Sequence, residues 1–231
     1  MRIIKISQSK DREAWLEFRR AKIMGSNSKS VLPLTRGVDR TPAGFWSLLA
    51  EKISVARDGE KEMERGHRLE NEGLAKTAEK YGIKFDLDPG VWISDEHGDL
   101  GISPDAAEPG DTPTYAGENK SLDSAKHIKF IYKDMQARKL ENYNPINSIP
   151  NEVGAYYKDQ VIEYFLVNEH LKTLYFTLYD DRIAYEHLEH YVIVVNRSDV
   201  DELVEKNREA HLDTLENVEK IIKQLTGELH E

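Results

Sequence analysis

Three charged residues in one short stretch of the chain have the types and spacing of a metal site that could cleave a phosphate ester. Asp105 follows Pro104, and Glu118 and Lys120 stand two residues apart. Side chains two residues apart on a β-strand leave the same face, so Glu118 and Lys120 would point together. Two carboxylates suit Mg²⁺, and a neighbouring lysine can orient or help deprotonate an attacking water. The trio indicates metal-assisted hydrolysis.

These residues meet if the chain around them forms a β-hairpin. Leu100 and Ile102 alternate with smaller or polar residues before the aspartate, a proline- and glycine-rich cluster spans 109–113, and residues 115–120 can form a second strand. We expect the strand that ends at Asp105 to pair with the strand that carries Glu118. A surface hairpin with a salt bridge is the alternative, because 42 of the 231 residues are acidic.

The elements that must hold this hairpin follow from hydrophobic spacing. Short helices are expected to begin at Asp11 and Thr41. No repeat or linker divides the chain, so we expect one α/β domain over residues 1–231, with its last helix serving core or subunit packing. Helical spacing predicts helices over 60–81, 124–135, 151–169 and 199–230. Strand-like runs lie over 83–93, with an interruption at Asp88-Pro89-Gly90, and over 171–179 and 190–195.

Two further polar residues are candidates for the same site. Glu70 lies in the helix expected at 60–81, and Gln160 sits among the aromatic residues of the helix expected at 151–169. Glu70 also fits a solvated helix face, and Gln160 also fits a helix flank. Gly66 lies near Glu70, and since a glycine inside a helix costs about 1 kcal/mol relative to alanine, it indicates close packing there.

Composition narrows the class of protein. Hydrophobic residues make up 39% and charged residues 32% of the chain, as in soluble globular proteins. No apolar run reaches the roughly 18 residues that cross a bilayer, and the first residues do not form a secretion signal. The chain has no cysteine, which excludes disulfides, thiolate zinc sites and cysteine-ligated clusters. We expect a cytoplasmic protein without membrane contact.

The charge balance bears on nucleic-acid binding. The formal net charge is −10, which argues against a surface coated with DNA-binding lysines. A nuclease can keep its positive charge in one groove or pocket, so the balance does not exclude DNA. Arg19 and Ser26 could face one anion if the turn between them folds back, although a surface arginine and a capping serine explain them as simply.

Taken in order, four motifs resemble those of the lambda-type phage exonucleases, also called YqaJ-type viral recombinases, a branch of the PD-(D/E)xK nuclease superfamily. The match covers about residues 15–165. One departure is Asn119, where the family often has a small or apolar residue. The motifs are Trp15-x3-Arg19-x3-Ile23-x2-Ser26, Arg65-Gly66-x3-Glu70, Ser103-Pro104-Asp105 with Glu118-x-Lys120, and the aromatic helix with Gln160.

The resemblance implies a core of a central mixed β-sheet flanked by helices, and a role for each candidate residue. Asp105, Glu118 and the backbone carbonyl of Asn119 would hold Mg²⁺, for which Mn²⁺ can substitute. Lys120 would activate or orient the water. The remaining roles are support of that water or of a second metal by Glu70 and Gln160, and binding of a 5′-terminal phosphate by Arg19, Ser26 and Ser103.

The resemblance also implies a function. Members of the family digest one strand of linear double-stranded DNA from its 5′ end to 5′-mononucleotides, as homotrimeric rings, beside a single-strand annealing protein in recombination. The protein would then be encoded by a phage or prophage in a bacterial host. Two alternatives stay open: an endonuclease of restriction or repair type, and a non-catalytic scaffold that binds DNA ends.

Overall fold

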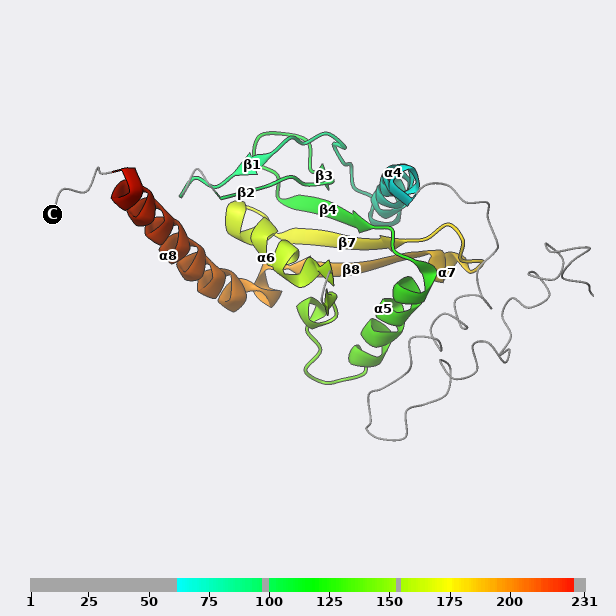
Figure 1. Cartoon of the computed structure of the whole chain (residues 1–231). Coiled ribbons are helices and arrows are strands. Elements are labelled where there is room, and N and C mark those ends of the chain that lie inside the picture. Colours follow the sequence, from blue (N-terminus) through cyan, green and yellow to red (C-terminus); the bar gives the residue numbers. More distant parts are fainter. Residues whose placement is uncertain (1–61, 97–99, 153–154, 227–231) are drawn as a thin grey trace, which may run out of the picture.

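A four-stranded mixed β-sheet lies at the centre of the molecule (Figure 1), in the strand order β3-β4-β7-β8. The computed structural model describes residues 62–96, 100–152 and 155–226. Strands β4 and β7 are parallel, and the two outer pairs are antiparallel. The mixed sheet expected from the resemblance is confirmed. Its strands are β3 Ala106–Ala107, β4 Tyr115–Lys120, β7 Thr173–Tyr179 and β8 His190–Asn196.

Helices cover both faces of this sheet. Helix α4 (Glu62–Tyr81) packs on the face that carries Gly117, since a side chain there would meet Leu74 of that helix. Helices α5 (Ser124–Ala137) and α6 (Tyr157–Val167) lie in the crossover between the parallel strands and pack on the other face. Burial of apolar area between these layers is the main source of stability. The core includes Phe130, Ile131, Val161, Phe165, Leu174, Phe176, Leu178 and Ile193.

Several expected elements are confirmed. Helix α4 ends before Gly82, whose φ of 65° favours glycine, and α5 begins after Asp123, whose side chain accepts a hydrogen bond from the backbone of Lys126. The two strand-like runs at 171–179 and 190–195 are β7 and β8, which pair along their whole length. The expected last helix is α8 (Asp201–Thr226).

One expected boundary was wrong. The helix expected from residue 151 begins only at Tyr157, because β5 (Asn151–Glu152) and β6 (Ala155–Tyr156) pair before it. The strand-like run over 83–93, which the sequence interrupts at Asp88-Pro89-Gly90, contains β1 (Trp92–Ile93) after the interruption and an isolated bridge at Asp86 before it.

The pairing within the hairpin also differs from the expectation. Strand β2 (Gly101–Ile102), which precedes Asp105, pairs with β1 and not with β4. The partner of β4 is β3, which follows the aspartate. Two-residue strands carry too little alternation to reveal their partners, so the sequence pattern could not separate these choices.

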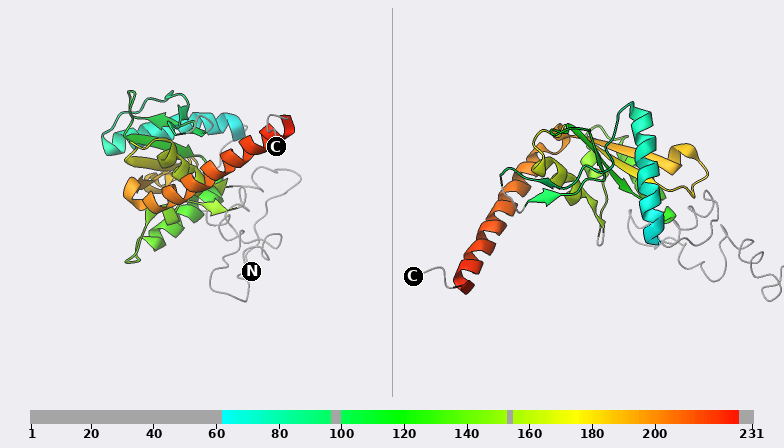
Figure 2. Two further views of the ribbon diagram at one scale, coloured as in Figure 1. Left: turned by 90° about the vertical axis from the view of Figure 1, so that its left-hand side faces the viewer. Right: turned by 90° about the horizontal axis from the view of Figure 1, so that it is seen from above.

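The C-terminal helix leaves the body of the molecule. Its start is packed, with Val200 and Val204 buried, and the helix then projects away (Figure 2). Just before it, Arg197 donates hydrogen bonds to the backbone carbonyls of Phe165, Asn168 and Leu171, and so ties down the end of α6. The remaining short helices are η1 Pro145–Asn147, α7 Glu186–Glu189 and η2 Arg197–Asp199. Over the described ranges, no helix is long and apolar enough to span a membrane.

Candidate active site

Asp105 and Glu118 are brought together by the β3–β4 pairing. Ala106 lies opposite Gly117, so continuing the antiparallel register by one residue places Asp105 opposite Glu118. The Oδ2 atom of Asp105 accepts a hydrogen bond from the backbone N–H of Asn119 at 2.9 Å. The predicted convergence of the two carboxylates is therefore present, although the strand after the aspartate produces it.

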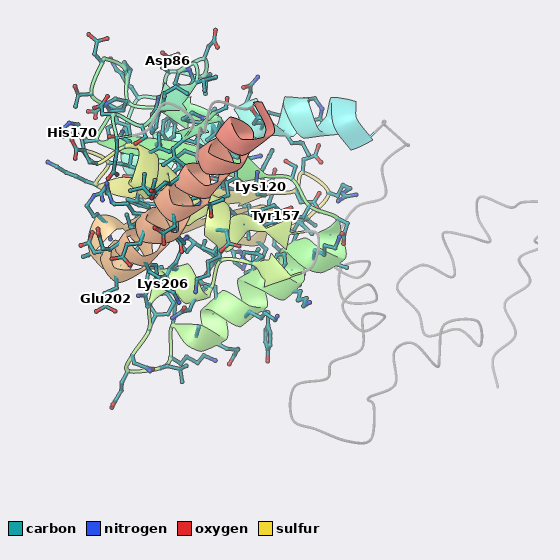
Figure 3. All side chains as sticks on the ribbon, turned by 60° about the vertical axis from the view of Figure 1, so that its left-hand side comes forward. Asp86, Lys120, Tyr157, His170, Glu202 and Lys206 are labelled. Atoms are coloured by element: carbon teal, nitrogen blue, oxygen red, sulfur yellow. The ribbon has the colours of Figure 1, made fainter. Side chains whose placement is uncertain are left out.

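Lys120 joins Glu118 on the same face of β4. The two residues alternate with Asn119, and the Nζ atom of Lys120 donates to Oε1 of Glu118. Glu118 is 1% exposed, so its charge is almost wholly removed from water. The ammonium also lies 5.2 Å from the ring centroid of Tyr157, the first residue of α6 (Figure 3). Lys120 is thus held between a carboxylate and an aromatic face.

Helix α6 supplies two hydrogen-bond donors to the Glu118 carboxylate. Gln160 donates from Nε2 to Oε1 at 2.8 Å, which places this residue in the site as the sequence led us to expect. The hydroxyl of Tyr164 donates to Oε2. Residues four apart on a helix share a face, so one side of α6 engages both oxygens. The sequence interpretation assigned Tyr164 only to the core, although its spacing of four from Gln160 could have indicated this role.

The electrostatics of the site show a shortage of positive charge. The pKa of Asp105 is raised to about 7, mainly by burial and then by the negative charge of Glu118, with a smaller contribution from Glu70. The Asn119 N–H and the charge of Lys120 lower it, but they do not offset the rise. An aspartate whose pKa lies so high is poorly compensated as an anion. Two carboxylates and one lysine therefore leave room for a further cation.

Lys120 and Tyr164 keep their protons. Burial lowers the pKa of Lys120, but the charge and hydrogen bond of Glu118, with the charge of Asp105, outweigh it and raise the pKa. Burial and Glu118 hold the pKa of the Tyr164 phenol well above its usual value. At neutral pH the site therefore contains an ammonium and a phenol that both donate hydrogen bonds.

The donor set fits a hard divalent cation. Asp105 and Glu118 offer carboxylate oxygens, and Mg²⁺ is commonly held by one or two carboxylates while it keeps several waters. No cluster of three or more His, Cys, Asp or Glu side chains that could hold a metal occurs among the described residues. Asn119 could contribute only its backbone carbonyl, because its side chain lies against Gly73 of α4, on the opposite face.

The other predicted residues are placed less closely. Glu70, half-buried on α4, lies within electrostatic range of Asp105, whose pKa it raises. Ser103 is exposed two residues before Asp105, and the structure does not show what it would bind. Arg19 and Ser26 lie outside the described residues, as do the helices expected to begin at Asp11 and Thr41. Arg65 and Gly66 lie within the helix α4, and the side chain of Arg65 is not among the described side chains.

Comparison with known proteins agrees with this geometry at the level of the fold. No family model and no curated protein sequence matches the chain. The crystal structure of an alkaline exonuclease from Laribacter hongkongensis, LHK-Exo, is similar, with a TM-score of 0.50, 20% identity, and coverage of 94% of this chain and 100% of that chain.

A second crystal structure, of LHK-Exo in complex with dAMP, gives a TM-score of 0.50 at 21% identity, again with 94% and 100% coverage. At these identities the likeness concerns the fold. The chain therefore shares its overall fold with an alkaline exonuclease, which agrees with the fold that the resemblance to the lambda-type exonucleases implies.

Proposed function

We propose that this protein is a Mg²⁺-dependent 5′-to-3′ exonuclease that digests one strand of linear double-stranded DNA and releases 5′-mononucleotides. One observation carries the proposal: Asp105, Glu118 and Lys120 converge on one spot beside Gln160, in a chain with the fold of an alkaline exonuclease. The separation of these residues in the sequence makes their meeting an informative result.

The residues of the site divide the work. Asp105, Glu118 and the Asn119 carbonyl would hold Mg²⁺, which when bound lowers the pKa of water and offsets charge on phosphorus. Lys120, kept as an ammonium, orients the attacking water and donates to a phosphate oxygen on which negative charge develops. Gln160 and Tyr164 fix the two oxygens of Glu118, so that this carboxylate needs little reorganisation.

Recognition of the DNA end is a separate part of the proposal. Arg19, Ser26 and Ser103 would bind the 5′-terminal phosphate, since arginine matches phosphate geometry and serine donates readily. The support for this pocket is the order of the sequence motifs. It predicts faster digestion of 5′-phosphorylated than of 5′-hydroxyl ends. Equal rates, with Arg19→Ala harmless, would remove the pocket.

The cellular role follows the same resemblance. We propose that the protein forms a homotrimeric ring, acts in the cytoplasm of a bacterial host with a single-strand annealing protein, and is encoded by a phage or prophage. A ring would also suit the net charge of −10, because a clamp that encircles DNA needs less electrostatic attraction. Sedimentation equilibrium with and without duplex DNA would measure the assembly.

The deciding experiment offers end-labelled linear duplex and covalently closed circular DNA, each with Mg²⁺, with Mn²⁺ and with EDTA. The proposal predicts loss of label from the 5′ end of the linear DNA with either metal only, and an intact circle. Cutting of the circle would favour an endonuclease instead. End binding without hydrolysis or metal uptake would favour the scaffold.

A further inference from the structure

A glycine in the middle of α4 marks the closest approach of this helix to the strand that carries the site. A Cβ atom built on Gly73 would lie 2.3 Å from Oδ1 of Asn119 and 2.9 Å from Cβ of Tyr179. Real Cβ atoms essentially never come so near to other heavy atoms, and Cβ of Tyr179 is fixed to its strand. Alanine at position 73 would favour the helix by about 1 kcal/mol, but its Cβ atom would not fit against β4 and β7.

The asparagine opposite this glycine is poorly able to move away. Asn119 is 6% exposed, and its Nδ2 atom donates to Oγ of Ser121 at 3.1 Å. Its Oδ1 atom is buried and accepts no hydrogen bond within the described parts of the chain. The carbonyl end of the side chain is thus packed against the bare backbone of Gly73. The side chain of Asn119 thus occupies the space that a side chain at position 73 of α4 would fill.

A second close contact joins α4 and β4, and here the glycine lies on the strand and the facing side chain on the helix. Gly117 lies two residues before Asn119 on the same face of β4, and a Cβ atom there would lie 2.7 Å from Cδ2 of Leu74. One glycine lies on the helix and the other on the strand, and each faces a side chain of the partner element. Such paired contacts fix both the height of α4 above β4 and its position along the strand.

This register bears on catalysis through Glu70. Residues three apart on a helix lie on neighbouring positions of one face, so Gly73 sets where Glu70 stands. Glu118 and Lys120 flank Asn119 on the other face of the same strand. We propose that Gly73 and Asn119 are a matched pair of positioning residues that hold Glu70 at its working distance from Asp105. The inference rests on the proposed nuclease function.

A double-mutant cycle tests the pair. Gly73→Ala, Asn119→Ala and the double variant are compared with wild type by thermal unfolding in EDTA and by single-turnover cleavage of end-labelled duplex in Mg²⁺. Gly73→Ala is expected to lower the cleavage rate at least tenfold with little change in KM for DNA. The double variant is expected to cleave at least fivefold faster than Gly73→Ala and to unfold at a higher temperature. Additive effects in both measurements would overturn the inference.

The control separates register from helix stability. Ala75 is exposed on α4, so Ala75→Gly weakens the helix by its lower propensity without touching β4. It should lower the unfolding temperature and leave the cleavage rate within twofold of wild type. A tenfold loss in Ala75→Gly would show that any weakening of α4 suffices and would contradict the pair.

The following results distinguish failure of this inference from failure of the proposed function. If Gly73→Ala does not fold, Asn119→Gln extends the amide into the same gap from the strand, and wild-type cleavage and unfolding by that variant would overturn the inference. If wild type degrades no DNA, the proposed function fails, while unfolding in EDTA still decides whether positions 73 and 119 are coupled. Active wild type with an equally active Gly73→Ala would remove the inference and leave the function intact.

Discussion

Two aspartates that are shielded from solvent, the fully buried Asp134 and the half-buried Asp105, are compensated in opposite ways. Asp134 on α5 is fully buried, and burial alone would raise its pKa, but hydrogen bonds from Tyr191, Arg138 and Tyr143 lower it below its usual range. Its oxygens accept from these groups at 2.6 to 2.8 Å. Asp105 accepts a hydrogen bond from the backbone N–H of Asn119 and interacts with the charge of Lys120, yet its pKa rises to about 7.

The difference teaches how to separate structural from functional carboxylates. Asp134 has donors enough to remain an anion inside the protein, so it ties α5 to β8 and the loop that follows the helix. Asp105 lies beside another carboxylate and lacks such donors, so a bound cation would be needed to compensate its negative charge. Four predictions test this contrast, starting with the largest effect.

Lys120→Ala should remove nearly all hydrolysis. It deletes the ammonium next to Glu118 and leaves the buried Glu118 and the half-buried Asp105 without their positive neighbour. We expect a loss of roughly 10³-fold or more in the single-turnover rate, as for removal of a positioned proton donor or charge. DNA binding should survive, as measured by fluorescence anisotropy in Ca²⁺. A variant that cuts at a tenth of the wild-type rate would contradict the assigned role.

Asparagine substitutions should affect the two aspartates in opposite directions. Asp134→Asn leaves Arg138 and two tyrosines without an anion, so it should lower the free energy of unfolding by about 3 kcal/mol and spare metal binding. Asp105→Asn relieves repulsion with Glu118, so in EDTA it should be as stable as wild type or more so, and it should lose cleavage. Chemical denaturation in EDTA and calorimetric Mg²⁺ titration check both; equal destabilisation would erase the contrast.

The stability of the metal-free protein should depend on pH through Asp105. Its folded pKa of about 7 lies above the ordinary value of 3.8, so the folded state binds more protons between these values. The stability contributed by this group is present below about pH 4 and is lost as pH rises towards 7. Relative to Asp105→Asn, wild type in EDTA should lose roughly 3 kcal/mol over this window. A flat difference would mean that Asp105 is well compensated.

Tyr164→Phe should have the smallest effect of the four. It removes the donor to one oxygen of Glu118 while Gln160 still holds the other. We expect about a tenfold slower cleavage and a raised Mg²⁺ requirement, since one hydrogen bond to a charged group is worth roughly 1.5 kcal/mol. Phe165, its neighbour in the core, offers the control Phe165→Leu, which should destabilise the fold without changing the Mg²⁺ requirement. Identical metal curves for Tyr164→Phe and wild type would show that the phenol only fills space.

The sequence predicted the residues of the site better than the strand pairings and helix boundaries that position them. Glu118 and Lys120 share a face because side chains alternate along a strand, a rule that needs no knowledge of the partner strand. The two long strands were also predictable, because runs of branched and aromatic residues favour a buried sheet. The helix with Gln160 was predicted, although its start was not, since the two-residue strands before it carry no periodic signal.

What escaped the sequence depends on contacts between distant segments. Nothing in the order of residues says that β3 and not β2 pairs with β4, or that Gly73 faces Asn119 across a helix and a strand. The raised pKa of Asp105 likewise arises from burial by elements far away in the chain. Local rules predicted which residues could react, and tertiary packing decided how they are held.

The contacts of Arg197 at the end of α6 predict a temperature-sensitive position outside the site. The guanidinium of Arg197 binds three backbone carbonyls at the end of the helix that presents Gln160 and Tyr164 to Glu118. Lysine cannot reproduce this fork, so even a conservative allele would loosen the helix end. A screen for temperature-sensitive variants should therefore recover position 197, far from the reacting groups, with loss of nuclease activity only on warming.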